Sequence, residues 1–472
     1  MSQAPASTLT VRQVKQLGGE ITVPGDKSLS HRAVLFSALA DGTTVIDGFL
    51  PGEDCVCTMR ALQAMGCTIE VESKTRLIVH GTAGKLLAPL EPLDCGNSGT
   101  AMRLMAGVLA GQSFTSRLIG DASLSSRPMK RIVDPLRQMG AKIEGKGEKH
   151  TAPLEITGGP LTGIEYTLPV ASAQLKSCLL LAGLFATGTT SITETTPSRD
   201  HTERLLAFFH APPVIAATPD GKGRTIRVRG GSKLHARDFN VPGDFSSAAF
   251  WIAAAAALPG ADLTITNLGL NGTRTGLLSV LLRMGAKVEV PGNPSEPSGA
   301  FPWDKGYIYE SISDSSCEPV GTVRVLGRKL HGTKISGAEI ANVIDELPII
   351  AVVGALADGD TEIRDAQELR VKETDRIAAM AKNLRAFGVD VTEHPDGMTI
   401  HGGAKLTGAR VGSFGDHRIA MSCAILGLFS KGETVIEETG CIATSYPSFE
   451  QDLHKIAYFH DPSLASLLGA GR

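Results

Sequence analysis

Alanine-rich apolar segments alternate with short strand-like segments along the whole chain. Four of the alanine-rich segments predict buried helices, and they cover residues 28–39, 100–109, 172–185 and 246–258. Each begins at Ser, Thr, Asn, Gly or Asp, the residue types that satisfy the unpaired N–H groups of a helix start. Such starts also favour anions, because the helix dipole points outward there. The alternation predicts the α/β class.

One short phrase recurs where a predicted helix meets a predicted strand: leucine, two further residues, an apolar residue and glycine. Glycine in this place is typical of a helix that ends in left-handed backbone. Degraded copies lie near residues 205–209 and 453–457. The complete copies end at Gly66, Gly140, Gly285 and Gly388. The phrase therefore marks repeating units.

A longer match links the two halves of the chain. Residues 23–33 read Val-Pro-Gly-Asp-Lys-Ser-Leu-Ser-His-Arg-Ala, and residues 241–249 read Val-Pro-Gly-Asp-Phe-Ser-Ser-Ala-Ala, an offset of 218 residues. The first and third complete phrases are 219 residues apart, and the second and fourth are 248 apart. The excess of 29 fits a Gly/Pro/Ser-rich stretch at 291–321, which we interpret as an inserted surface loop that is dispensable for chemistry. We therefore expect six units of about 70 residues, arranged as three plus three.

Composition excludes several classes of protein. A chain of 472 residues favours more than one hydrophobic core. The net charge of −3 supplies no basic field for nucleic acid or a membrane surface. The eight cysteines lack CxxC spacing, which favours reduced thiols in the cytoplasm over disulfides or structural zinc. The N-terminus has no apolar signal core, and the longest apolar run, 248–258, is too short to span a membrane.

Basic side chains occupy only one of the two long matching stretches. The first carries Lys27, Ser28, His31 and Arg32, whereas the second has Phe245 in place of Lys27 and no base nearby. A duplicated scaffold with cations in one copy suggests a site where two similar halves meet.

Further cations lie beside glycine-rich or small-residue segments. Arg127 follows a loop of small residues, and Arg418 ends the sequence Gly-Asp-His-Arg. Lys372 and Arg376 are four residues apart and share a face if that stretch is helical. Each cation alone is typical of a solvated surface. As a set, in a protein without overall positive charge, they predict a small polyanionic ligand.

Two carboxylates stand among these cations. Asp345 is either a helix cap or a group that does chemistry, because it lies in a polar pair between apolar runs. Glu373 is adjacent to Lys372 and three residues before Arg376, so an intrahelical ion pair also explains it.

Eight phrases of the sequence form a specific combination. They are PGDKSLSHR (24–32), GNSGTAMR (96–103), SRPM (126–129), SAQLKS (172–177), RDHTER (199–204), NVIDELP (342–348), ELRVKETDR (368–376) and GDHRIAM (415–421). Together they resemble the 3-phosphoshikimate 1-carboxyvinyltransferase family, also called the EPSP synthases, along nearly the whole chain. The SAQLKS, RDHTE and NVIDELP phrases resemble its bacterial class II branch.

The resemblance implies a fold of two similar domains, each made of three βαβαββ units around a pseudo-threefold axis. The lower domain is then discontinuous, with residues 1–22 and 242–472 and the inserted loop near 291–321. The upper domain covers residues 23–241. The three-plus-three repeat supports this division independently.

The resemblance also implies a reaction. The 5-hydroxyl of shikimate 3-phosphate attacks C2 of phosphoenolpyruvate while C3 is protonated, and the tetrahedral intermediate then loses phosphate, in aromatic amino-acid biosynthesis. We expect no metal and no organic cofactor, because positioned cations can supply the electrostatic stabilisation. We expect a cytoplasmic monomer whose partners are small anionic substrates, with no nucleic acid and no membrane.

Residue by residue, the resemblance implies three roles. Asp345 is the expected base for the 5-hydroxyl, Glu373 the proton donor to the methylene carbon, and Lys27 an aid to either transfer. Shikimate 3-phosphate is expected to contact Lys27, Ser28, Arg32, Ser172, Gln174, Arg199, Asp345 and Lys372, with the backbone of Ala173. Phosphoenolpyruvate is expected to contact Lys27, Gly99, Arg127, Gln174, Arg376 and Arg418.

The chain departs from the family pattern at a few positions. Thr444 stands where some members have a lysine that contacts phosphate, and Glu368 replaces an asparagine seen elsewhere. Some class II members resist the phosphonate inhibitor glyphosate because an alanine stands where this chain has Gly99. We therefore expect this chain to be sensitive.

Two other functions compete with this interpretation. The sister enzyme that transfers the same group to a UDP-sugar commonly has a cysteine in the loop before the arginine matched by Arg127, and no cysteine lies between Cys95 and Cys178. The other is a non-catalytic anion-binding protein on the same scaffold. The presence of both Asp345 and Glu373 beside the cations argues against it.

Overall fold

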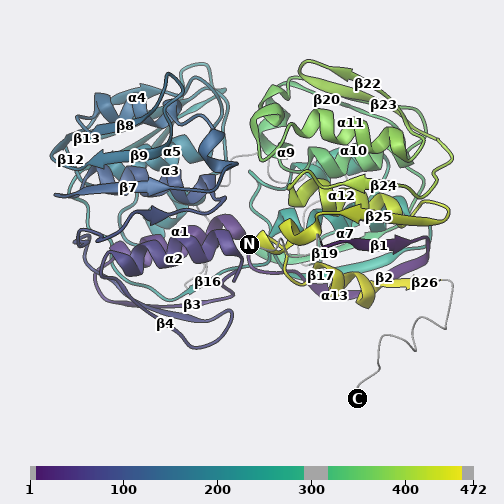
Figure 1. Ribbon diagram of the computed structural model, residues 1–472, viewed down its shortest axis with the longest axis horizontal. Coiled ribbons are helices and arrows are strands. Elements are labelled where there is room, and N and C mark those ends of the chain that lie inside the picture. The colour runs from purple at the N-terminus through teal and green to yellow at the C-terminus, as the bar shows by residue number, and fades with distance from the viewer. Residues whose placement is uncertain (1–6, 292–316, 460–472) are drawn as a thin grey trace. The chain divides into compact units, whose positions relative to one another are not determined.

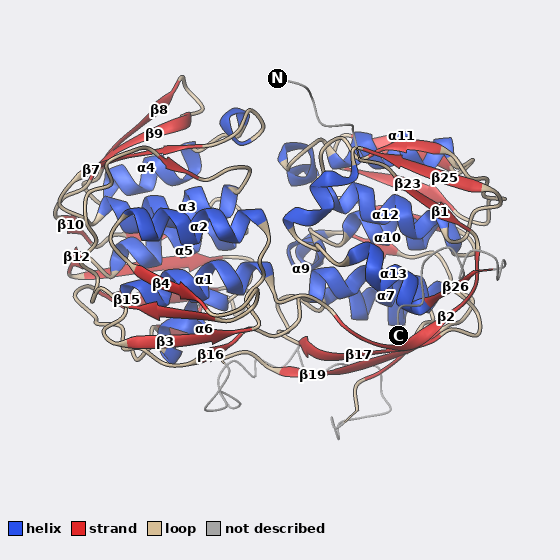
Figure 2. Ribbon diagram, turned by 60° about the horizontal axis from the view of Figure 1, so that its bottom comes forward, coloured by secondary structure: helices blue, strands red, loops and turns tan. Residues whose placement is uncertain are grey.

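The computed structural model describes residues 7–291 and 317–459, which divide into two compact units. Of the described residues, unit 1 holds 7–24, 243–291 and 320–459. Unit 2 holds 25–242 and the short segment 317–319. Both units mix α-helices with small sheets. Within each unit the helices lie inside and the sheets outside (Figure 2).

Unit 2 contains six α-helices in its described residues. These are α1 (Lys27–Leu39), α2 (Glu53–Ala64), α3 (Gly99–Ala110), α4 (Lys130–Gln138), α5 (Ala173–Gly183) and α6 (His201–Phe208). The strands are β3 (Thr43–Asp47), β4 (Thr68–Val71), β5 (Leu77–His80), β6 (Leu93–Asp94), β7 (Thr115–Ile119), β8 (Lys142–Lys146), β9 (Thr151–Thr157), β10 (Leu161–Thr162), β11 (Glu165–Thr167), β12 (Ala186–Thr187), β13 (Thr189–Glu194), β14 (Val214–Ala217), β15 (Arg224–Arg229) and β16 (Phe239–Asn240).

The larger sheets of unit 2 repeat one topology three times. Their strand orders are β16-β3-β5-β4, β6-β7-β9-β8 and β11-β13-β15-β14. In each sheet the first pair is parallel and the next two pairs are antiparallel. This is the threefold repeat that the glycine phrases predicted.

Unit 1 contains seven α-helices in its described residues. These are α7 (Phe245–Ala257), α8 (Gly276–Arg283), α9 (Ile340–Val343), α10 (Leu347–Leu356), α11 (Arg376–Ala386), α12 (His417–Gly427) and α13 (Phe449–Ile456). The strands are β1 (Leu9–Arg12), β2 (Val14–Thr22), β17 (Asp262–Gly269), β18 (Lys287–Glu289), β19 (Val320–Leu326), β20 (Lys334–Ile335), β21 (Asp360–Ile363), β22 (Asp390–His394), β23 (Gly397–His401), β24 (Arg410–Gly412), β25 (Glu433–Glu437) and β26 (Ala457–Phe459).

The sheets of unit 1 follow the same plan with modifications. The order β20-β21-β23-β22 repeats the pairing seen in unit 2. A second sheet, β18-β19-β17-β2-β26, adds β26 as a fifth strand beside β2. The third, β1-β25-β24, has three strands. The same sheet pattern therefore recurs along the chain. It varies most in the two sheets that contain β1, β2 and β26.

The helix-end glycines have the backbone that their phrase predicted. All four complete copies are left-handed, with φ of 87°, 101°, 94° and 92°. In each copy the phrase's leucine carbonyl accepts a hydrogen bond from the N–H after the glycine, as in Cys67 to Leu62 and Val389 to Leu384. The copy near 205–209 places His210 at this position with φ 67°. The copy near 453–457 differs, because Ala457 is extended and leads directly into β26.

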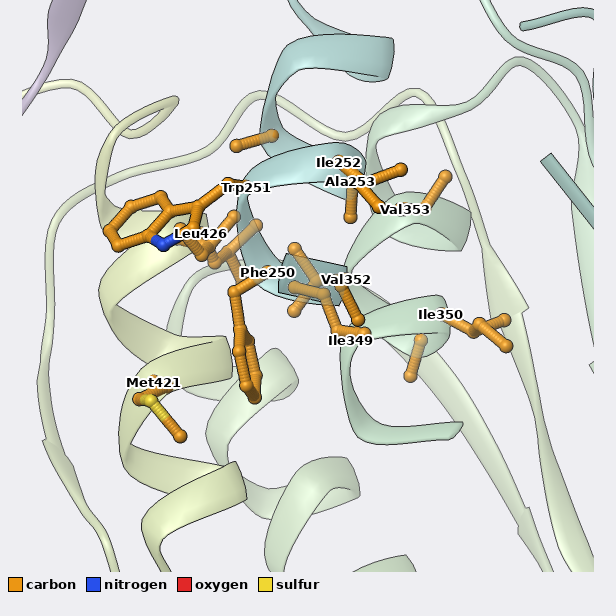
Figure 3. Packing of buried hydrophobic residues seen from close by; sticks show 14 of the residues in the cluster. Phe250, Trp251, Ile252, Ala253, Ile349, Ile350, Val352, Val353, Met421 and Leu426 are labelled. Atoms are coloured by element: carbon orange, nitrogen blue, oxygen red, sulfur yellow. The ribbon is translucent and has the colours of Figure 1, made fainter. Parts of the chain in front are cut away.

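Each unit has its own hydrophobic core around three central helices. α3 packs beside α5 in unit 2 (Figure 1), and α10 contacts both α7 and α12 in unit 1. Figure 3 shows the interior of unit 1, where Trp251 of α7, Val352 of α10 and Leu426 of α12 lie within one apolar cluster. Because these helices are apolar on nearly all sides, their polar residues are concentrated at their ends.

The four predicted buried helices are present within two residues of their expected bounds. The observed helices are α1, α3, α5 and α7. Their caps are Asp26, Ser98, Ser172 and Asp244, and every one accepts a backbone N–H hydrogen bond. The capping residues that the sequence indicated are therefore the residues that begin these helices.

The expected surface loop at 291–321 is only partly described, because 292–316 lie outside the described residues. Its last part differs from the expectation. Cys317 and Glu318 are buried in unit 2, and β19 of unit 1 begins at Val320. The Gly/Pro/Ser composition gave no sign of this burial, because it depends on contacts with a distant helix. Among the described residues, no helix is both long and apolar enough to cross a membrane.

Candidate active site

The starts of the central helices of unit 2 bring the predicted basic and polar residues together in three groups. α1, α3 and α5 each follow a cap whose side chain accepts the backbone N–H three residues later. The other N–H groups of a helix start point outward and favour a negative charge. The side chains around these starts decide what kind of anion fits.

Lys27 is the first residue of α1, and its side chain is 20% exposed. Its Nζ lies 2.6 Å from Oδ2 of Asp54, so a carboxylate neutralises the ammonium in this structure. Asp54 was not predicted, because it belongs to α2, where two acidic residues in the first turn are expected as ordinary helix stabilisation.

Arg32 lies one turn further along α1 and is buried at 3% exposure. Its guanidinium donates to Thr202 Oγ1 at 2.8 Å, to Ser177 Oγ at 2.8 Å and to the Ser28 carbonyl at 3.0 Å. Arg32 therefore links the start of α1 to α5 and α6. A guanidinium tied to two hydroxyl groups has a fixed direction, as recognition of a phosphate or carboxylate requires.

Gly99 and Arg127 also lie together. Arg127 donates to the Asn97 side chain at 2.6 Å and its carbonyl at 3.2 Å, and to Ser123 Oγ at 3.1 Å. A Cβ added to Gly99 would lie 3.4 Å from Arg127 Nη1 and 2.8 Å from Arg103 Nη1. The absence of a side chain at Gly99 leaves room beside two guanidinium groups.

Gln174 connects the starts of α5 and α3. Its Oε1 accepts from Arg103 Nη1 at 2.6 Å, and its Nε2 donates to Thr100 Oγ1 at 2.8 Å. Arg103 was missed among the candidate residues, although the phrase that contains it was recognised. Its spacing of four residues from Gly99 on one helix face was the available signal.

Arg199 stands two residues before α6 and is half-buried. The preceding carbonyl, that of Ser198, accepts from Arg224 Nη2 at 2.8 Å and from Lys176 Nζ at 3.4 Å. Both cations also contact the buried carboxylate of Glu194. A buried ion network therefore holds the backbone from which Arg199 projects.

His31 supports these helix starts from inside unit 2. Its Nδ1 lies 2.7 Å from Thr58 Oγ1, and its Nε2 lies 3.4 Å from Oγ of Ser98, the cap of α3. Burial, assisted by the charges of Lys27 and Arg32, holds the pKa of His31 well below its usual value. A neutral imidazole can join the two hydroxyl groups without adding charge.

In unit 1, Asp345 lies among three cations. Its Oδ1 is 3.5 Å from Arg376 Nη1 and 3.7 Å from Lys372 Nζ, and its Oδ2 is 3.8 Å from Arg418 Nη2. The Asp345 carbonyl also accepts from Arg418 Nη1 at 3.0 Å. The side chain is 16% exposed, and it does not cap α10, since Glu346 holds that place. Asp345 therefore has the accessibility and the charged neighbours of a reactive carboxylate.

Glu373 and Asp345 share one guanidinium, that of Arg376. Arg376 donates to Glu373 Oε2 at 2.6 Å and to Asp416 Oδ2 at 2.7 Å, and only 1% of its side chain is exposed. Burial alone would lower the pKa of Arg376, but the carboxylates of Asp416, Glu373 and Asp345 raise it above its ordinary value. The arginine is therefore a permanent cation between two candidate acid–base groups.

Lys372 and Arg376 do not belong to one helix. Lys372 is extended after the 3₁₀ helix Gln367–Val371, and α11 begins only at Arg376. Asp375 caps α11, so the chain turns immediately before it. Lys372 and Arg376 nevertheless approach one carboxylate, Asp345, because the turn places them together.

A known protein family matches the chain across nearly its whole length. The sequence profile of EPSP synthase (3-phosphoshikimate 1-carboxyvinyltransferase) matches residues 11–453. The chain belongs to the EPSP synthase family. The match covers both units and every candidate residue described above.

Named relatives agree with this family. The 3-phosphoshikimate 1-carboxyvinyltransferase of Akkermansia muciniphila is 49% identical over 93% of this chain and 98% of its own length. That of Xanthomonas campestris pv. campestris is 50% identical over 92% and 93%. Among solved structures, EPSP synthase from Acinetobacter baumannii has a TM-score of 0.80 at 42% identity and covers 96% of this chain and 98% of that one. The enolpyruvyl transferase NikO from Streptomyces tendae, at TM-score 0.73 and 18% identity over 96% and 98%, shows the shared fold alone.

The two positions expected to depart from the family pattern, Thr444 and Glu368, both lie in 3₁₀ helices. Thr444 ends the 3₁₀ helix Thr439–Thr444, and its Oγ1 donates to the Cys441 carbonyl at 2.8 Å. The Thr444 hydroxyl donates within its own turn and carries no charge, so it cannot replace the phosphate contact of a lysine at this position. Glu368 lies in the 3₁₀ helix before Lys372 and is half-buried.

Proposed function

We propose that this chain transfers the enolpyruvyl group of phosphoenolpyruvate to the 5-hydroxyl of shikimate 3-phosphate and releases inorganic phosphate. The observation that carries the proposal is the arrangement of Asp345 and Glu373 around the guanidinium of Arg376. A purely anion-binding site needs the cations but gains nothing from two partly exposed carboxylates beside them. The family match and the names of the relatives support the same reaction.

We assign the binding of shikimate 3-phosphate to Lys27, Ser28, Arg32, Ser172, Gln174, Arg199, Asp345 and Lys372. The fixed direction of Arg32 and the supported backbone before Arg199 suit a bidentate contact with an anionic oxygen pair.

We assign phosphoenolpyruvate to a second set of residues: Lys27, Gly99, Arg127, Gln174, Arg376 and Arg418. Gly99 would let the ligand approach Arg127 closely, because no Cβ fills that space. Arg376 is 1% exposed, so a ligand would reach it only after Glu373, at 26% exposure, moves aside.

The acid–base roles follow if phosphoenolpyruvate replaces Glu373 beside Arg376. The carboxylate of Asp345 would take the proton of the 5-hydroxyl as the oxygen attacks C2, and Glu373 would give a proton to C3. An ion pair with Arg376 favours the ionised form of Glu373. Displacement of that pair by the carboxylate of phosphoenolpyruvate would therefore make protonation of Glu373 easier. In the second half, C3 returns a proton as the C–O bond to phosphate breaks.

We propose a cytoplasmic monomer that needs no metal or organic cofactor. Reduced thiols support the location, since the eight cysteines form no disulfide in the described chain. The charged groups already present support cofactor-free chemistry.

The test of this function is phosphate release by the purified protein. Release is expected only when shikimate 3-phosphate and phosphoenolpyruvate are both present, and a UDP-sugar offered in place of shikimate 3-phosphate should give none. Phosphate release with the UDP-sugar would show that the chain has the activity of the sister enzyme instead. Binding of both anions without any release would reduce it to an anion-binding protein.

A further inference from the structure

The segment Cys317–Pro319 is an unexpected component of unit 2. Cys317 is fully buried in the hydrophobic core of this unit, and Glu318 is 3% exposed. The chain then enters β19 of unit 1 at Val320. A segment of three residues far from residues 25–242 in sequence therefore carries one buried carboxylate into unit 2.

Glu318 meets a buried histidine there. Its Oε1 lies 2.7 Å from Nδ1 of His201, the first residue of α6, and the two side chains are 1% and 2% exposed. When either member of a buried, hydrogen-bonded pair is removed, the remaining group is left buried without a partner, and the folded state is strongly destabilised. This contact therefore constrains where α6 begins.

Arg204 links the same segment to α6 a second time. Its Nε donates to Asp200 Oδ1 at 3.0 Å, and its Nη1 lies 3.5 Å from the Cys317 carbonyl. Burial alone would lower the pKa of Arg204, but the carboxylates of Asp200 and Glu318 raise it above its ordinary value. Residues 317 and 318 therefore complete a charged network around the first turn of α6.

The first turn of α6 is connected to Arg32 and Arg199, two candidate ligands of shikimate 3-phosphate. Thr202, next to His201, accepts from Arg32 Nε at 2.8 Å and lies 2.6 Å from Ser177 Oγ. Arg199 lies two residues before His201 on the segment that leads into α6. A shift of His201 would therefore be transmitted to both arginines through short, direct connections.

We propose that Glu318 is a positioning residue for shikimate 3-phosphate: by holding His201 it fixes the first turn of α6, and with it the guanidinium groups of Arg32 and Arg199. This rests on the proposed function, which assigns those arginines to that substrate. Glu318 itself touches neither substrate. Its effect on the binding of shikimate 3-phosphate should exceed its effect on phosphoenolpyruvate, because Arg127 and Gly99, which are assigned to phosphoenolpyruvate alone, do not contact this network in the described chain.

The test is the steady-state kinetics of Glu318→Gln, which keeps the shape and removes the charge. The KM for shikimate 3-phosphate should rise by about tenfold, which corresponds to about 1.4 kcal/mol. The KM for phosphoenolpyruvate and kcat should change by less than about twofold. Glu91→Gln, an exposed glutamate of the same unit, is the matched control and should leave all three parameters unchanged.

A double substitution separates positioning from general loss of structure. Arg199→Ala removes one group through which Glu318 acts, so adding Glu318→Gln should raise the KM for shikimate 3-phosphate by much less than it does alone. If Glu318→Gln does not fold, Glu318→Asp keeps the charge, shortens the reach and should give a smaller rise of the same kind. A folded variant with an unchanged KM for shikimate 3-phosphate, or equal losses for both substrates, overturns the inference. Absence of phosphate release by the wild type would instead overturn the proposed function.

Discussion

The starts of α1 and α7 are two copies of one sequence with opposite surroundings. Asp26 and Asp244 cap them in the same way, each with its side chain on backbone N–H groups of the first turn. The next residue is a partly exposed Lys27 in α1 and a buried Phe245 in α7. The duplicated scaffold thus keeps its caps, which the helix requires, and differs at the first helical residue, which is a partly exposed cation in α1 and a core side chain in α7.

Ser28 and Ser246 extend the comparison. The Ser28 carbonyl accepts from Arg32, whose guanidinium also reaches Thr202. Ser246 instead donates to the buried carboxylate of Glu346 and accepts from Arg274 at 2.8 Å. At α7 these charged groups contact one another inside the unit. The candidate catalytic residues of unit 1 lie elsewhere, before α10 and near the starts of α11 and α12.

The sharpest way to break this assignment is Asp345→Asn, which changes the group before α10. Turnover should fall by roughly 100- to 10,000-fold, because an amide cannot accept the hydroxyl proton. Affinity for shikimate 3-phosphate should be kept or improved, since a negative charge is removed from among three cations. The measurements are phosphate release and equilibrium binding. Asp390→Asn, on the exposed face of unit 1, is the control, and near wild-type turnover in the Asp345 variant would remove it from the base role.

Lys27→Met tests the cation-bearing copy. The side chain keeps its length but loses its charge, so kcat/KM should fall by about 100- to 1,000-fold, the usual effect of removing one group that stabilises a developing charge. Stability should change little by comparison. Steady-state kinetics measure the expected loss of kcat/KM, and chemical unfolding measures stability, with Lys85→Met as an exposed control. An active variant with lowered stability would give Lys27 a structural role like that of its counterpart.

Phe245→Ala tests the other copy and should give the reverse pattern. Phe245 is 1% exposed in the core of unit 1. Truncation of such a side chain lowers the free energy of unfolding by about 3–5 kcal/mol. Where the variant remains folded, at low temperature, both KM values should stay close to those of the wild type. Val214→Ala, at an exposed position, controls for the loss of apolar surface; a raised KM without loss of stability would contradict the division between the copies.

The sequence predicted what depends on local chemistry. Caps and apolar segments were enough to place α1, α3, α5 and α7, and the helix-end glycines could be identified because only glycine adopts left-handed backbone easily. The contact of Arg103 with Gln174 was not predictable, since it depends on how α3 packs against α5. The same holds for Glu318, whose neighbours in sequence suggested a surface loop and whose actual neighbour, His201, is 117 positions away.

The interior histidine of α1 has no counterpart in α7, where the matching residue is Ala249. Burial, Lys27 and Arg32 hold the pKa of His31 well below 6.5, while Asp26 opposes them. As the pH falls below about 6.5, the unfolded chain takes up a proton at His31 that the folded chain does not. This contribution to stability is therefore fully present above that pH and is lost below it, by up to about 1.4 kcal/mol per pH unit.

Urea unfolding at about pH 7.5 and about pH 5.5 measures this dependence in the wild type and in His31→Asn. The variant should be less stable at the higher pH, because it no longer bridges Thr58 and Ser98 in the same way. Its stability should also fall less on acidification. Parallel losses in the two proteins would assign the pH dependence to other groups, with His80→Asn as an exposed histidine control.

Gly99 is the residue after the cap of α3, the same position that Lys27 and Phe245 occupy in α1 and α7. A Cβ there would lie 2.8 Å from Arg103 Nη1, so Gly99→Ala should push that guanidinium aside and narrow the space beside Arg127. Glyphosate takes the phosphoenolpyruvate position in this family and is slightly longer. The added methyl group should therefore hinder the binding of glyphosate more than that of phosphoenolpyruvate. We expect the wild type to be inhibited competitively with phosphoenolpyruvate, and Gly99→Ala to raise the inhibition constant by about tenfold, or about 1.4 kcal/mol, with a smaller rise in KM. Inhibition constants and KM values of the two proteins decide this. Equal resistance in both proteins would show that a methyl group at the first position of α3 does not determine whether glyphosate binds.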